Sequence, residues 1–144
     1  MKKNIAVFSS GRGGNFENIC NYFQHDNSVF VALHVTNKLN SISKTIADKR
    51  NVRNVYVTKR GLEKNSFCEI LQENNIHFIV LAGFLLKLPS RLVSSYDKKI
   101  INLHPSLLPK FGGKGMYGDN VHLKVLASDE KKTGITIHYV NEEY

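Results

Sequence analysis

The stretch Ile5-Ala-Val-Phe-Ser-Ser-Gly-Arg-Gly-Gly-Asn15 decides the fold of this chain. It opens with an apolar run over residues 5–9, which predicts a buried strand, and continues into a glycine-rich turn. Apolar side chains then recur at helical spacing, at Phe16, Ile19, Cys20 and Phe23. A strand, a tight turn and an amphipathic helix form the first half of a β-α-β unit, so the next strand is expected to run parallel to the first.

The same alternation continues along the chain. Further strands are predicted over residues 29–35, 55–57, 78–82, 99–103 and 135–140, and helices over 41–50, 63–74, 90–96 and 121–128. Strands that alternate with helices predict an α/β fold: a Rossmann-like, doubly wound and mainly parallel sheet with helices on both faces. Ligands bind such sheets beyond the carboxyl ends of the strands, so we expect the chemistry just after Ser9, Leu81 and Ile101.

Length and composition indicate a single cytoplasmic domain over residues 1–144. The chain is 42% hydrophobic and 22% charged, and none of its apolar runs reaches the roughly 20 residues that a membrane-spanning helix needs. Its beginning lacks the pattern of a signal peptide. Cys20 and Cys68 lie in helical patterns and are expected to be reduced. We therefore expect no membrane association.

The charge pattern argues against a nucleic-acid partner. The net charge is +8, but lysine and arginine are scattered, and no basic segment is interleaved with aromatic residues. Most of this charge is interpreted as solvated surface, and the rest could steer anionic substrates. The six histidines show no metal-ligand spacing, so no metal is expected.

The turn after the first strand is a candidate phosphate site. Glycines expose the backbone amides, the start of the following helix adds partial positive charge, and Asn15 can add a donor. A plain tight turn is the alternative. Phe16 stands where the dinucleotide fingerprint has its third glycine, so the sequence gives little support for NAD binding.

Two later strand ends carry further candidates. The apolar loop over residues 82–89 could line a pocket for a flat heterocycle, although ordinary core packing would explain it equally. Asn102 and His104 are two residues apart in an extended segment and therefore face the same side. An amide donor beside an imidazole suits a reaction that creates an oxyanion and moves a proton.

The other histidines carry weaker signals. His138 lies in an alternating strand, where it could face the same site or be a satisfied histidine beside the core. His122 begins the helix after a long glycine-rich loop and could reach a substrate. His25, His34 and His77 show no partner pattern and are expected at the surface or at the boundary of the core.

Four segments resemble the folate-dependent formyltransferases. Asn102-Leu-His-Pro-Ser-Leu-Leu-Pro109 is similar to the active-site motif of that family. Ser10-Gly-Arg-Gly-Gly-Asn15 resembles the phosphate loop of the branch that acts on glycinamide ribonucleotide. Ala82-Gly-Phe84 and Gly134-Ile-Thr-Ile-His-Tyr-Val140 also match in order, so the resemblance covers nearly the whole chain.

The resemblance implies a reaction of purine biosynthesis. A formyl group would pass from 10-formyltetrahydrofolate, the co-substrate, to the amine of 5-phosphoribosylglycinamide. Asn102 would polarise the formyl carbonyl and stabilise the oxyanion, and His104 would donate or relay a proton. The protein would be a monomer or a homodimer, with these two small molecules as its partners.

The resemblance also assigns binding residues. Gly13, Gly14 and Asn15 would hold the ribonucleotide phosphate. The segment Leu85-Leu86-Lys87-Leu88, with Asn102, would bind the folate pterin. Lys64 and Arg60 are weak candidates for the folate tail. The residues that carry these roles are Gly13, Gly14, Asn15, Leu85, Leu86, Lys87, Leu88 and Asn102, with Lys64, His122 and His138 as weaker candidates.

Two departures from the family pattern bear on these roles. The loop over residues 111–118 is longer than usual and is expected to be a mobile flap, which weakens the assignment of His122. The family aspartate that tunes the catalytic histidine would follow Tyr144 directly, and further strands and a helix would follow it. We therefore expect residues 1–144 to be a formyltransferase domain without its C-terminal end, belonging to a longer protein.

Other functions stay open at this point. A 10-formyltetrahydrofolate hydrolase would use a similar set of residues with water as the acceptor. A methionyl-tRNA formyltransferase would need a basic extension for tRNA, which this sequence does not show. A nucleotide-binding module without catalysis would explain the glycine-rich turn but would leave Asn102 and His104 without a role.

Overall fold

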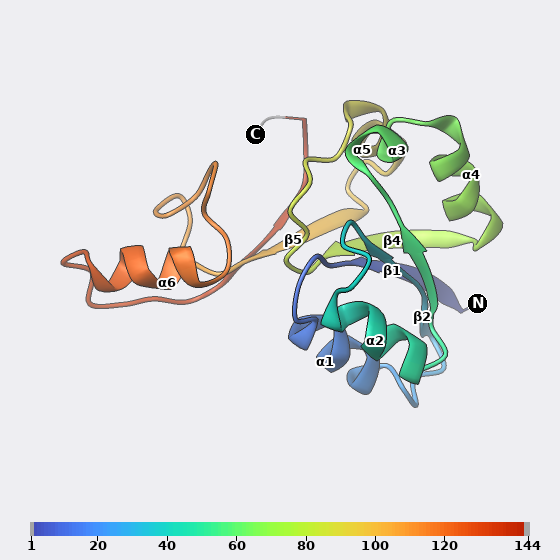
Figure 1. The fold of residues 1–144 in the computed structure, drawn as a ribbon, viewed down its shortest axis with the longest axis horizontal. Helices are drawn as coiled ribbons and strands as arrows, with labels where there is room; N and C mark the ends of the chain where they lie inside the picture. The colour runs from blue at the N-terminus through green and yellow to red at the C-terminus, as the bar shows by residue number, and fades with distance from the viewer. Residues whose placement is uncertain (1, 143–144) are drawn as a thin grey trace.

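A computed structural model describes residues 2–142. Within this range six strands form one sheet in the order β3-β2-β1-β4-β5-β6 (Figure 1). β1 to β5 are parallel, and β6 pairs with β5 in the antiparallel direction. The strands are β1 Lys3–Phe8, β2 Val29–Thr36, β3 Arg53–Tyr56, β4 Ile76–Leu81, β5 Ile100–His104 and β6 Thr136–Tyr139. This arrangement confirms the predicted α/β fold, and its strand order is that of doubly wound nucleotide-binding sheets.

Helices cover both faces of the sheet. α1 Gly14–Tyr22 and α2 Ile42–Lys49 lie on one face, and α3 Lys59–Leu62, α4 Asn65–Glu73 and α5 Ser90–Ser95 lie on the other (Figure 1). α6 Asp119–Leu126 belongs to an arm that extends away from the sheet beyond β5 and β6. None of the helices within residues 2–142 is long and apolar enough to cross a membrane.

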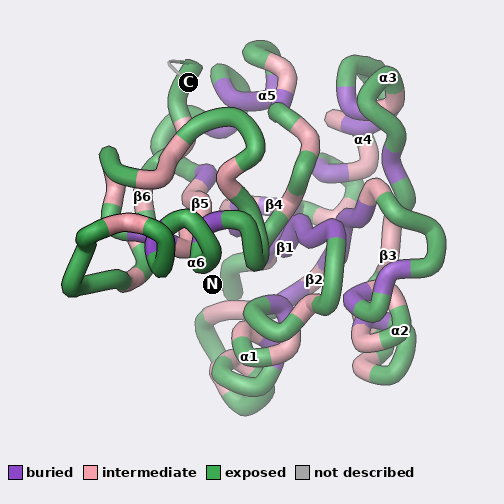
Figure 2. Tube along the Cα trace, turned by 60° about the vertical axis from the view of Figure 1, so that its left-hand side comes forward, coloured by how far each residue is buried: buried purple, intermediate pink, exposed green. Residues whose placement is uncertain are grey.

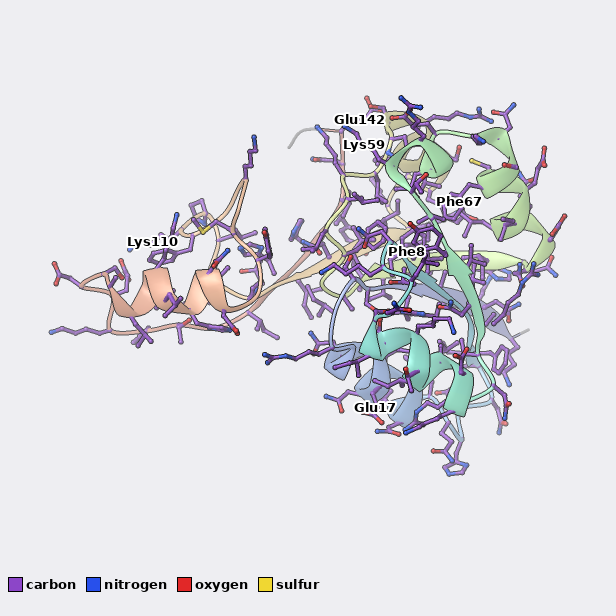
Figure 3. The ribbon with its side chains drawn as sticks, viewed as in Figure 1. Phe8, Glu17, Lys59, Phe67, Lys110 and Glu142 are labelled. Atoms are coloured by element: carbon purple, nitrogen blue, oxygen red, sulfur yellow. The ribbon has the colours of Figure 1, made fainter. Side chains whose placement is uncertain are left out.

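The two faces form separate apolar cores because side chains alternate along each buried strand. Val7 of β1 packs with Phe16 of α1 and Ala47 of α2. Phe8, the next residue, points to the opposite face, where its ring lies edge-on to Phe67 of α4 at 6.0 Å between ring centroids (Figure 3). Figure 2 shows that the buried segments concentrate along the central strands, whereas most of the arm is exposed.

The observed strands and helices follow the predictions, and their ends differ from the predicted ones by at most two residues. The exception is α3, a single turn at Lys59–Leu62, where the sequence predicts no element. Four residues are too few for apolar periodicity to show. Its cap is nevertheless readable, because the side chain of Thr58 accepts a hydrogen bond from the amide of Gly61 at 3.0 Å.

Candidate functional site

The carboxyl ends of the central strands lie in one register row. Phe8 of β1 pairs with Leu81 of β4, Leu81 pairs with Asn102 of β5, and Asn102 pairs with His138 of β6. Neighbouring strands are about 4.8 Å apart, so Phe8 and Asn102 are separated by about 10 Å. The segments after residues 8 and 81 therefore begin at the same edge of the sheet as Asn102, within the span of a small substrate.

The loop after β1 leaves the first amides of α1 without a side-chain cap. Gly13 is the N-cap of α1 with φ 76°, and no side-chain cap engages the helix amides there. A Cβ at Gly13 would lie 2.6 Å from the Cβ of Ser43, so only glycine fits against α2. Gly14 faces open space, and Asn15 is exposed. The first amides of α1 are therefore available to an anionic ligand.

Arg12 connects this loop to the arm. Its guanidinium lies 4.0 Å from the carboxylate of Asp119, the first residue of α6. Both side chains are largely exposed, so the contribution of this ion pair to stability is small. The contact places the start of α6 beside the glycine-rich turn.

The segment after β4 presents an uneven surface. Phe84 packs edge-on against Phe8 at 5.3 Å, and Leu88 is buried in the core. Leu85 is 40% exposed, and Lys87 is also exposed. Among the residues expected to bind folate, Leu85 and Lys87 are therefore at the surface, whereas Leu88 can offer only its backbone.

The structure brings Asn102 and His138 together. The side-chain amide of Asn102 lies 3.1 Å from Nε2 of His138 across the β5–β6 pair. Nδ1 of His138 lies 3.0 Å from the carbonyl of Tyr139, so it carries the proton in the neutral ring and Nε2 accepts from Asn102. The amide has two hydrogens, and the second makes no hydrogen bond within residues 2–142. His138 therefore lies beside Asn102, and both of its ring nitrogens are hydrogen-bonded.

His104 is held by the loop that follows it. Its Nε2 donates to the carbonyl of Phe111 at 2.8 Å, which leaves Nδ1 as the acceptor in the neutral ring. The hydroxyl of Ser106 donates to the carbonyl of Lys110 at 2.8 Å and holds the same turn. His104 and Asn102 share a face of β5 but are not hydrogen-bonded to each other within the described residues.

Three of the expected residues lie outside this row of strand ends. His122 is exposed on α6, in the extended arm (Figure 1). Lys64 lines a separate cavity of about 220 Å³ with Val55 and Phe67, and none of residues 85–88 lines it. Arg60 is exposed on α3.

The carboxylate expected from the family pattern cannot be placed, because the aspartate would follow Tyr144 and so lies outside the described residues. Glu142 is turned toward α5, where its carboxylate accepts a hydrogen bond from the hydroxyl of Ser94 at 2.5 Å.

A buried histidine beneath the glycine-rich turn was missed from the sequence. His34 was expected at the surface or boundary, but its exposed fraction is 0%. Its Nε2 accepts from the hydroxyl of Ser9 at 2.8 Å, its Nδ1 donates to Asn54 at 2.5 Å, and its ring stacks on Phe16 at 4.4 Å. Burial lowers the pKa of His34 below its usual value, so the ring is neutral. The available signal was its place between Leu33 and Val35 in a strand covered on both faces.

Ser10 is the second buried polar residue that the sequence did not reveal as important. It is 1% exposed, and its hydroxyl accepts a hydrogen bond from the amide of Leu85 at 2.9 Å. The same hydroxyl donates to the side chain of Asn37, and the Ser10 amide donates to the carbonyl of Gly83 at 3.1 Å. Ser10 thus joins the ends of β1, β2 and β4.

A large cavity lies on the other face of β5. Its volume is about 1020 Å³, and its apolar walls include Phe78, Val80, Ile101 and Leu103. Ile101 and Leu103 alternate with Asn102 and His104 along the strand, so the cavity opens away from those two side chains. Among the residues expected in the site, only Asn15 lines this cavity within the described part of the chain. Within residues 2–142 no group of three or more histidine, cysteine or acidic residues could hold a metal ion.

Comparison with known proteins places this architecture in a family. A family model described as formyl transferase matches residues 3–144. The chain is similar to a protein of Arabidopsis thaliana named phosphoribosylglycinamide formyltransferase, chloroplastic, with 40% identity over 99% of this chain and 51% of that protein. It is also 35% identical to the phosphoribosylglycinamide formyltransferase of Bacillus subtilis, over 99% of this chain and 73% of that one.

A solved structure shows the same likeness in three dimensions. Glycinamide ribonucleotide transformylase 1 from Geobacillus kaustophilus matches with a TM-score of 0.84 and 34% identity, over 99% of this chain and 76% of that chain. The present chain spans about half the length of its Arabidopsis relative.

Proposed function

We propose that this chain, which belongs to the formyl transferase family, carries the site that transfers a formyl group from 10-formyltetrahydrofolate to the amine of 5-phosphoribosylglycinamide. The observation that carries the proposal is the row at the edge of the sheet. It groups a helix start suited to phosphate, an exposed apolar loop and an Asn-x-His pair within about two strand spacings. The names of the relatives from Arabidopsis and Bacillus subtilis support the ribonucleotide acceptor and the transferred formyl group.

The acceptor would be held by its phosphate at the start of α1. The free amides near Gly13 and Gly14 match the oxygens of a phosphate, and the helix dipole favours their negative charge. The Asn15 side chain is exposed and can add a donor. Fixing the phosphate about two strands from Asn102 would direct the glycinamide amine toward the formyl carbon.

Asn102 would stabilise the charge that develops during attack. The amine adds to the formyl carbon, the carbonyl oxygen becomes an oxyanion, and the tetrahedral intermediate collapses as the bond to N10 of the folate breaks. The free hydrogen of the Asn102 amide would donate to that oxyanion, while the other stays on His138. One such preorganised donor contributes about 3 kcal/mol to lowering the barrier.

His104 would handle the proton that the reaction must move. The attacking amine loses a proton, and N10 of the folate gains one. The hydrogen bond from Nε2 to Phe111 fixes the ring and leaves Nδ1 able to accept and return a proton.

The direct test uses the full-length gene product. Folate absorbance is followed after mixing with 10-formyltetrahydrofolate, with and without 5-phosphoribosylglycinamide. We expect turnover only with the ribonucleotide, and a fall in kcat of about 10²–10³-fold for Asn102→Ala, with a similar loss for His104→Ala. His25→Ala is the matched control, because His25 is exposed and lies outside this edge.

Two outcomes would replace the proposal. Turnover without the ribonucleotide would identify a 10-formyltetrahydrofolate hydrolase. Absence of turnover in both reactions would leave a nucleotide-binding protein without catalysis.

Compartment and assembly are part of the same proposal. We place the reaction in the cytoplasm, and since the Arabidopsis relative is named as chloroplastic, cell fractionation is the test. The protein is proposed to act as a monomer or homodimer, which sedimentation of the full-length protein would decide.

A further inference from the structure

We infer that Ser10 is a positioning residue that fastens the proposed phosphate loop to the proposed folate loop and thereby makes the two substrates bind cooperatively. The role rests on the proposed function, because it names a property of that same pair of subsites. Ser10 itself would touch neither substrate, since it is 1% exposed.

The contacts of Ser10 join the two loops directly. Its hydroxyl accepts the amide hydrogen of Leu85 at 2.9 Å, and its own amide donates to the carbonyl of Gly83 at 3.1 Å. Both partners belong to the segment after β4, from which the folate loop continues. Gly11, the next residue after Ser10, opens the glycine-rich turn, so no spacer separates the two loops.

The same hydroxyl is fixed from its other side. It donates its hydrogen to the side-chain oxygen of Asn37, just after β2. A hydroxyl has one hydrogen to donate, so its orientation is set once Asn37 accepts it, and its lone pairs face Leu85. The turn is also held by α2, because the amide of Ser43 donates to the carbonyl of Gly11 at 3.1 Å.

Cooperative binding follows from this geometry. A phosphate bound at Gly13 and Gly14 would restrict the turn, and the restriction would pass through Ser10 to Leu85. The folate would then meet a loop that is already ordered, so its Kd would fall. By linkage the folate must tighten the ribonucleotide by the same factor, which we expect to be about five-fold or more.

The test measures binding rather than turnover. Tetrahydrofolate, which has no formyl group to transfer, and 5-phosphoribosylglycinamide are titrated into the full-length protein by calorimetry, each alone and each in the presence of the other. We expect the two affinities to enhance each other by about five-fold or more in the parent and by less than about two-fold in Ser10→Ala. Thr36→Val is the matched control, since it removes a buried hydroxyl that contacts neither loop, and it should keep the parent coupling.

A second measurement reports on the hydrogen bond itself. In the parent protein the NMR signal of the Leu85 amide should shift when the ribonucleotide alone is added, and this shift should be lost in Ser10→Ala. If Ser10→Ala does not fold, Asn37→Ala replaces it, because it frees the hydroxyl to rotate away from Leu85. That variant should weaken the coupling in the same direction.

The outcomes separate the two hypotheses. Equal affinities with and without the second ligand, an unmoved Leu85 signal, or full coupling in the variant would overturn the role of Ser10 alone. A parent protein that binds neither molecule would overturn the proposed function, and the coupling with it.

Discussion

Replacing Gly13 by alanine tests whether the glycine-rich turn is held by its contact with α2. Gly13 has φ 76°, a left-handed conformation that costs an alanine about 1–2 kcal/mol. The added Cβ would lie 2.6 Å from Cβ and 2.8 Å from Cα of Ser43, and relieving such overpacking costs about 1–3 kcal/mol more. Alanine also reduces the conformational entropy of the unfolded chain, which offsets about 0.4–1 kcal/mol of this loss of stability. The free energy of unfolding should therefore fall by about 2–4 kcal/mol.

Gly14→Ala is the matched control for this substitution. Gly14 is the first residue of α1, its φ is not in the left-handed region, and a Cβ there would meet nothing within 4 Å. Alanine is the better helix former, so the variant should equal or exceed the parent stability by up to about 1 kcal/mol. Both substitutions add one methyl group to adjacent residues, so only the conformation and the neighbour differ.

Urea unfolding of the full-length protein, followed by circular dichroism, measures both variants. In thermal scans the Gly13→Ala protein should melt roughly 5–15 °C below the parent, given a shift of about 2–4 °C per kcal/mol for chains near this size. A Gly13→Ala protein as stable as the parent would refute the reasoning, since the turn would then not be pressed against Ser43. Equal losses in Gly13→Ala and Gly14→Ala would also refute it.

Three further predictions concern the surroundings of the site. Because burial lowers the pKa of His34 below 6.5, the unfolded chain binds that proton first as the pH falls. The contribution of His34 to the free energy of unfolding should be complete above about pH 6.5. Below that pH the free energy of unfolding should fall by at most about 1.4 kcal/mol per pH unit. In urea titrations at several pH values, His34→Gln should remove this part of the pH dependence. Phe67→Ala should lower the free energy of unfolding by about 3–5 kcal/mol in the same assay, because Phe67 is 2% exposed. Thr136→Val should lower kcat more than it raises KM, because the threonine hydroxyl accepts from Leu108 at 3.0 Å and donates to Ser106 at 2.7 Å, bracing the loop that holds His104, the proposed proton carrier.

Each of these has a contrary result. A His34→Gln protein with the parent pH slope would show that the buried ring does not govern that window. A loss below about 1 kcal/mol for Phe67→Ala would mean that the core closes around the missing ring. Unchanged kinetics in Thr136→Val would show that the loop after β5 is held by its other contacts.

Most of the fold could be read from the chain because its signals are local. Continuous apolar runs predicted the strands, and the spacing of Phe16 and Cys20 predicted the buried side of α1, where both residues are buried. The single turn α3 was not predicted, because four residues are too few to show the apolar periodicity of a helix. Strand ends differ from the predicted ones by up to two residues. Hydrogen bonding between strands sets those ends, and it is not visible in a single segment.

The candidate site could be read only in part. The Asn-x-His pattern and the glycine-rich turn named residues that the structure places at one edge of the sheet, and whether they act as proposed is for the kinetic tests to decide. His34 was misjudged because its partners, Ser9 and Asn54, lie 25 and 20 residues away in the sequence. A polar residue in a strand buried on both faces needs such partners, and a single sequence does not show which ones it finds.

The sequence alone therefore determined the order of elements, the apolar faces and the segments that follow each strand, because periodicity and turn chemistry act over a few residues. Only the tertiary structure decided which of those segments meet. Asn102 and His138 are 36 residues apart, and Ser10 and Leu85 are 75 apart. Their contacts depend on the register of four strands, and a shift of one residue in any strand would turn these side chains to the other face of the sheet.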